Sequence, residues 1–221
     1  MNMNTLNASF LPVVALSCVL MAGCSASGPR NAGVYLLLDT SGTYNEELEK
    51  AEQIINYTLS RLGALDSFAV ARIDTGSFSE RDIVARVTLD DRPSTANAQK
   101  RLFSQEINQF ISTVQPSPYT DITGGLLQAV EFLNEKEPGR KTIFIFSDLK
   151  EDLDEGYIRD LVVELEGFEI VALNVTKLRS DNIDPREYLE RLEGWRHRVE
   201  AEGGSWRVIN DLDHLQGLLS S

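Results

Sequence analysis

The sequence is poor in the side chains that most often carry nucleophilic and metal chemistry. It has only two cysteines and two histidines in 221 residues. Both cysteines, Cys18 and Cys24, precede the predicted domain, which excludes cysteine catalysis, disulfides and thiolate zinc sites within that domain. His197 and His214 stand in no recognisable motif, so we expect them at the surface or at the edge of the core.

Basic side chains are also scarce, with 21 Lys and Arg against 34 Asp and Glu and a formal net charge of −13. Binding to a phosphate backbone needs clustered Lys and Arg. The composition therefore excludes a general nucleic-acid-binding protein. The overall composition, 42% hydrophobic and 25% charged, is typical of a globular protein. The chain is long enough to bury a core without a disulfide.

The N-terminal segment differs from the rest of the chain. Residues 1–23 carry no charged side chain, and a mostly apolar run extends from Phe10 to Ala22. This run is too short to span a bilayer comfortably but has the length of the apolar region of a secretory signal. It ends in Leu-Met-Ala-Gly-Cys at residues 20–24, which resembles the signal of bacterial lipoproteins, in which Cys24 would be lipidated and become the new N-terminus.

This resemblance implies three parts. Residues 1–23 would be a lipoprotein signal peptide, residues 24–32 the lipidated cysteine with a short tether, and residues 33–221 one folded domain. The protein would then be attached to the membrane of the cell envelope by its N-terminal lipid. Ser25 fits sorting to the outer membrane where the bacterium has two membranes. An ordinary secretion signal and an uncleaved anchor helix are the alternatives.

Apolar periodicity in the remaining chain alternates between strand and helix patterns. Strands are predicted at 34–38, 68–73, 83–89, 142–146, 170–175 and 206–209, and helices at 44–62, 95–114, 122–135, 156–165 and 184–201, followed by a short helix with Leu212, Leu215 and Leu219. This order predicts an α/β fold with a doubly wound, mostly parallel sheet covered by helices on both faces. Alternating polar and apolar residues at 83–89 predict one antiparallel edge strand.

Two charged stretches in the second half have ordinary explanations. Arg and Glu alternate along the helix predicted at 184–201, as is typical of an exposed helix face with i,i+4 pairs, and Trp195 has core spacing. Glu151, Asp152, Asp154 and Glu155 are predicted to form a solvated loop that caps the next helix, with attraction of cations as the alternative.

Oxygen-bearing side chains gather where the predicted strands end. Asp39 and Asp148 each follow a buried strand, Ser41 and Thr43 follow Asp39, and Thr120 lies in a later loop. In open α/β sheets, ligands bind beyond the carboxyl ends of the strands. Hard oxygen donors without nitrogen or sulfur favour Mg²⁺, Mn²⁺ or Ca²⁺ over zinc or copper.

These segments resemble the metal-ion-dependent adhesion site of von Willebrand factor A (vWA) domains. The family pattern is D-x-S-x-S/T, then a Thr, then an Asp after a later strand, and it matches residues 39–43, Thr120 and Asp148 in order. The segment 120–126 resembles the family's middle motif, while Leu149 stands where a glycine is frequent.

The resemblance also implies roles for these residues. Ser41 and Thr43 would bind the metal directly, Thr120 directly or through water, and Asp39 and Asp148 mainly through water. Neutral hydroxyls leave a dication only partly neutralised, so it attracts a further anionic oxygen. In the family, an Asp or Glu of a protein partner supplies that oxygen, and we expect the same of this chain, without enzymatic activity.

Other interpretations of these residues remain open. An Asp, Ser or Thr after a strand often caps the following helix, and Thr43 with Glu46 matches a capping box. The protein would then be a scaffold whose metal site is empty. A Mg²⁺-dependent phosphohydrolase would need a general base or nucleophile beside the metal.

In every case the tether enters the first strand at its amino end, so the lipid and the site are expected at opposite poles.

Overall fold

The structure is a computed structural model, and it describes residues 30–42, 47–74, 76–155, 162–178 and 180–210. The predicted signal peptide, Cys24, Thr43 and the short helix predicted near the C-terminus lie outside the described residues. Among the residues that are described, no helix combines the length and apolar character needed to cross a membrane.

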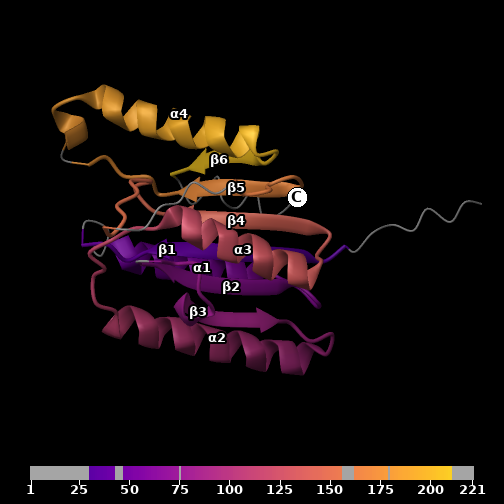
Figure 1. Ribbon diagram of the computed structural model, residues 1–221. Coiled ribbons are helices and arrows are strands. Elements are labelled where there is room, and N and C mark those ends of the chain that lie inside the picture. The colour runs from indigo at the N-terminus through magenta and orange to yellow at the C-terminus, as the bar shows by residue number, and fades with distance from the viewer. Residues whose placement is uncertain (1–29, 43–46, 75, 156–161, 179, 211–221) are drawn as a thin grey trace, which may run out of the picture.

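The described domain is built on one six-stranded sheet. Its strands are β1 (Ala32–Asp39), β2 (Ser67–Ile73), β3 (Ile83–Thr88), β4 (Arg140–Phe146), β5 (Phe168–Leu173) and β6 (Ser205–Ile209). The spatial order is β3-β2-β1-β4-β5-β6, with β3 antiparallel to β2 and all other neighbours parallel (Figure 1). The predicted sheet and its antiparallel edge strand are therefore confirmed.

Helices cover both faces of this sheet, as predicted. Core side chains of α1 (Leu48–Arg61) and α2 (Pro93–Thr113) pack with Leu36 and Leu38 of β1. Core side chains of α3 (Ile122–Lys136) and α4 (Pro185–Ala201) belong to the layer that contains Tyr35 and Leu37. Because successive side chains of a strand point to opposite faces, the continuous apolar run of β1 supplies both layers.

One predicted helix is wrong in its described part. Residues 156–161 of the predicted helix 156–165 lie outside the described residues, and residues 162–165 are not helical. Val162 is 81% exposed, whereas Val163 and Leu165 are buried. The closely spaced apolar residues of this segment predict a helical stripe, but the burial of residues 162–165 alternates with the period of two that an extended chain gives.

The first turn of α3 packs closely against its surroundings. Asp121 is the N-cap residue of α3, and its carboxylate accepts the Gly124 N–H at 2.8 Å. An added Cβ on Gly124 would lie 2.4 Å from Oδ2 of this carboxylate. A Cβ on Gly125 would lie 2.8 Å from Leu37 of β1. The paired glycines therefore let α3 begin directly above the central strand.

Replacing Gly124 by alanine is expected to lower the free energy of unfolding by about 1–3 kcal/mol, because the buried cap carboxylate must move. Gly194, which is exposed on α4 with no atom near its Cβ position, offers a matched control. Alanine there should raise stability by about 0.5–1 kcal/mol, since glycine is a poor residue inside a helix. Urea denaturation measures both changes, and an equal change at the two sites would contradict the close packing of Gly124.

Candidate metal centre

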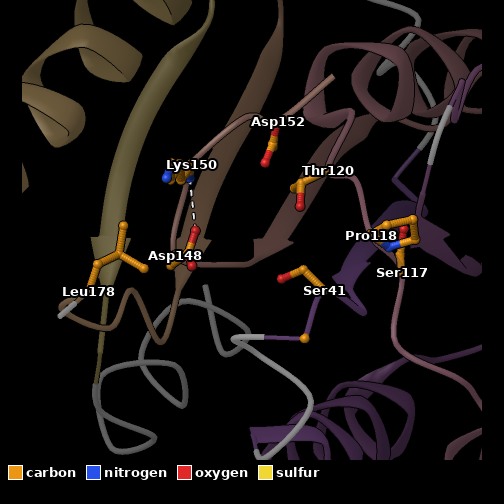
Figure 2. A pocket seen from close by; sticks show the side chains of 9 residues that line it. Ser41, Ser117, Pro118, Thr120, Asp148, Lys150, Asp152 and Leu178 are labelled. Atoms are coloured by element: carbon orange, nitrogen blue, oxygen red, sulfur yellow. Dashed lines mark hydrogen bonds between the residues drawn. The ribbon is translucent and has the colours of Figure 1, made fainter. Parts of the chain in front are cut away.

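The strand order changes direction between β1 and β4, which is where ligands bind in doubly wound sheets. Leu38 of β1 is paired with Phe146 of β4, so Asp39 and Asp148 follow neighbouring strand ends. A cleft of about 340 Å³ opens there, lined by Ser41, Gly42, Ser117, Pro118, Thr120, Asp148, Lys150, Asp152 and Leu178 (Figure 2). Three predicted site residues, Ser41, Thr120 and Asp148, therefore share one cleft.

Asp39 is fully buried and does not line the cleft. Its Oδ1 accepts the Ser41 N–H at 2.8 Å, and its Oδ2 accepts the Ser147 hydroxyl at 2.6 Å. Burial raises the pKa of Asp39, hydrogen bonds from Ser147 and Ser41 oppose this, and the charge of Asp148 adds to it. The carboxylate thus ties the end of β1 to the end of β4 and orients Ser41.

Backbone pairing fixes the loops that carry the hydroxyl groups. Thr120 exchanges two backbone hydrogen bonds with Asp152, at 2.7 and 3.0 Å. Ser41 forms a single parallel bridge with Ser117, whose N–H donates to the Thr40 carbonyl at 2.8 Å. The loops after β1, before α3 and after β4 are thereby joined around the cleft.

Asp148 lies at the start of a strained turn. Its side chain faces the cleft and accepts the Lys150 N–H at 2.9 Å (Figure 2). Leu149 has a φ of +66°, the left-handed conformation that glycine adopts readily and a leucine avoids. The leucine is tolerated because its side chain is buried, its N–H donates to the Ser147 hydroxyl, and its carbonyl accepts the Trp195 indole N–H at 2.9 Å.

The prediction of an exposed arginine face on α4 is wrong for Arg191. Its side chain is only 12% exposed and pairs with Asp181, which lies outside the helix, at 2.8 Å. Its Nε also donates to the Asp148 carbonyl at 2.8 Å. Arg196, by contrast, forms the expected exposed pairs with Glu193 and Glu200.

Two residues outside the predicted metal site, Lys150 and Asp152, line the cleft beside Asp148. These three residues alternate along the chain, and all three line the same cleft. Glu151, between them, accepts hydrogen bonds from the Thr123 N–H and hydroxyl, both at 2.7 Å. The prediction of a merely solvated loop is therefore wrong for Glu151, and the alternation was the signal that could have found the other two residues.

Helix capping accounts for some of the motif residues but not for Asp39. Asp121 caps α3 and Asp184 caps α4. The N-cap residue of α1 is Glu47, which makes no side-chain cap hydrogen bond, and the Asp39 carboxylate is directed to Ser41 and Ser147 instead. The capping box suggested for Thr43 and Glu46 lies outside the described residues.

The donor chemistry of the cleft fits a hard divalent cation. Hydroxyl and carboxylate oxygens converge there, and within the described part of the chain no group of three or more His, Cys, Asp and Glu side chains is arranged to hold a metal. The hydroxyl groups of Ser41 and Thr120 could bind a cation at this site, with Asp39 and Asp148 supplying negative charge around it. Mg²⁺, Mn²⁺ and Ca²⁺ accept such oxygen ligands.

Comparison with known proteins identifies the fold. No family model and no curated protein matches the sequence. Among solved structures, a von Willebrand factor type A protein from Catenulispora acidiphila matches with a TM-score of 0.53 and 13% identity, over 86% of this chain and 41% of that one. The pilus adhesin SpaC from Lactobacillus rhamnosus GG matches with a TM-score of 0.52 and 13% identity, over 86% of this chain and 29% of that one. The chain thus spans less than half the length of these proteins, and it shares their vWA-like α/β fold.

Proposed function

We propose that this vWA-like domain binds a divalent cation and uses it to hold an Asp or Glu side chain of a protein partner. The observation that carries the proposal is the convergence of Ser41, Thr120 and Asp148 on one cleft where β1 and β4 end. Capping of a following helix does not require side chains from three separate loops to meet in this way.

The protein residues have distinct parts in this proposal. Ser41 and Thr120 offer neutral hydroxyl oxygens, and Thr43 would add a third, while Asp39 and Asp148 balance part of the metal charge from farther away. The bound cation would supply the positive charge that holds the partner's carboxylate. We propose binding and not catalysis. Holding a partner's carboxylate on a cation needs no proton transfer, whereas a hydrolase needs a correctly placed general base.

The proposed site faces away from the membrane. The N-terminal Cys24 would carry the lipid and leave the protein in the cell envelope, at the outer membrane of a bacterium with two membranes. β1 begins at Ala32, directly after the proposed tether in the chain, and ends at the cleft. A partner would therefore approach the domain from the side opposite to its own membrane.

Metal dependence tests the proposal directly. Isothermal titration of Mg²⁺ or Mn²⁺ into the purified protein is expected to give about one equivalent of binding. Capture of a partner from envelope extracts should require added Mg²⁺ and should be abolished by EDTA. Absence of metal binding, or equal capture with Mg²⁺ and with EDTA, would contradict the proposal and favour a scaffold that works through other surfaces.

A further inference from the structure

We propose that Arg191 and Trp195 of α4, together with Asp181, are positioning residues that hold the turn after β4 so that Asp148 faces the cleft. The inference rests on the proposed metal site, but the ordering of this turn can be measured without any metal. We call these three residues the α4 clamp.

Two adjacent backbone carbonyls of the turn are held by the same helix. Arg191 Nε donates to the Asp148 carbonyl at 2.8 Å, and Trp195 Nε1 donates to the Leu149 carbonyl at 2.9 Å. Arg191 and Trp195 are four residues apart, so their side chains lie on one face of α4. The helix therefore fixes the peptide groups on both sides of the Leu149 Cα.

A buried carboxylate fixes the position of the guanidinium. Asp181 is 1% exposed and accepts hydrogen bonds from Arg191 at 3.2 and 2.8 Å. The same carboxylate accepts the Leu178 N–H at 2.7 Å, and Leu178 lines the cleft. The ion pair thus connects the turn after β4 with the loop after β5, which also lines the cleft.

Holding the turn matters because its conformation is unfavourable for leucine. Leu149 keeps a φ of +66°, and a relaxation to negative φ would rotate the neighbouring peptides and turn Asp148 from the cleft. A glycine would adopt this turn without help. In this chain, contacts from α4 stabilise the left-handed conformation that a glycine would adopt without such contacts.

The test compares Arg191→Met, Arg191→Lys and Trp195→Phe with Arg196→Met, a control that removes an exposed arginine from the same helix. Hydrogen exchange of the metal-free protein is measured in a peptide covering residues 147–152, and Mg²⁺ affinity is measured by titration. Arg191→Met and Trp195→Phe are expected to speed exchange in this peptide and to weaken Mg²⁺ binding by about tenfold, the loss typical of residues that orient metal ligands. The control should change neither.

Arg191→Lys separates positioning from stability. A lysine keeps a positive charge for Asp181 but cannot contact Asp181 and the Asp148 carbonyl with one planar group. Most of the thermal stability should return, while fast exchange and weak Mg²⁺ binding should persist. If Arg191→Met does not fold, Trp195→Phe decides, because phenylalanine keeps the ring in the core and removes the N–H donor.

Two outcomes would overturn the inference. One is normal exchange at residues 147–152 in both Arg191→Met and Trp195→Phe; the other is full recovery of exchange and Mg²⁺ affinity in Arg191→Lys. Failure of the wild-type protein to bind Mg²⁺ would instead contradict the proposed function, and the exchange rates would still decide whether the α4 clamp orders the turn.

Discussion

Replacing Asp148 by alanine is expected to weaken Mg²⁺ binding by about 10- to 100-fold while the domain stays folded. The Asp148 side chain faces the cleft and accepts the N–H of Lys150, so its removal takes a negative charge from the site. Isothermal titration measures the loss, and a melting curve verifies folding. Asp39→Ala should also lose metal affinity, but with lower stability, because Asp39 is fully buried and accepts two hydrogen bonds.

Two neighbouring substitutions sharpen this prediction. Asp154→Ala removes the same charge from the same loop but from outside the cleft lining, so Mg²⁺ affinity should change little. Lys150→Gln removes a positive charge that lines the cleft and should raise Mg²⁺ affinity by roughly threefold to tenfold. Equal affinities for wild type and Asp148→Ala would show that Asp148 takes no part in binding.

The fold was predictable because its signals are local and strong. The continuous apolar run of β1 is typical of a strand buried on both faces, and the alternation in β3 indicates an edge strand. Parallel strands joined by right-handed crossovers then bring the carboxyl ends of β1 and β4 to one edge of the sheet. For this reason the meeting of Ser41, Thr120 and Asp148 could be predicted from the sequence.

The support behind the site could not be predicted in the same way. Arg191 stands among glutamates that suggest an exposed helix face, yet its partner Asp181 lies outside α4, in the short 3-10 helix η3 (Ser180–Asn182) that precedes it. A local charge pattern does not reveal such a tertiary pair. The conformation of Leu149 could not be predicted either. Its left-handed φ, which glycine adopts more readily, depends on buried hydrogen bonds with Ser147 and Trp195.

Replacing Asp181 by asparagine is expected to lower the free energy of unfolding at pH 7 by roughly 3 kcal/mol, because it leaves the Arg191 guanidinium buried without its counter-charge. The Asp181 side chain is 0% exposed and that of Arg191 is 12% exposed. Glu193→Gln is the matched control, since Glu193 pairs with Arg196 at the surface, where solvent screens the ion pair and its loss should cost much less stability. Urea denaturation of both variants measures the difference, and similar losses would show that the Asp181–Arg191 pair behaves as a surface pair.

The same pair gives the protein a pH dependence of defined sign. Hydrogen bonds from Arg191 hold the pKa of Asp181 below its ordinary value, against the opposing effect of burial. A carboxyl group whose pKa is lowered by folding contributes stability above its unfolded pKa of about 4 and loses it as pH falls through the folded pKa. The stability difference between wild type and Asp181→Asn should therefore be full at pH 7 and should shrink below about pH 4, because protonated Asp181 resembles asparagine in charge. Urea denaturation between pH 7 and pH 3 measures how the unfolding free energies of the two proteins approach each other. If their difference is already lost at pH 6, a group other than Asp181 causes the effect.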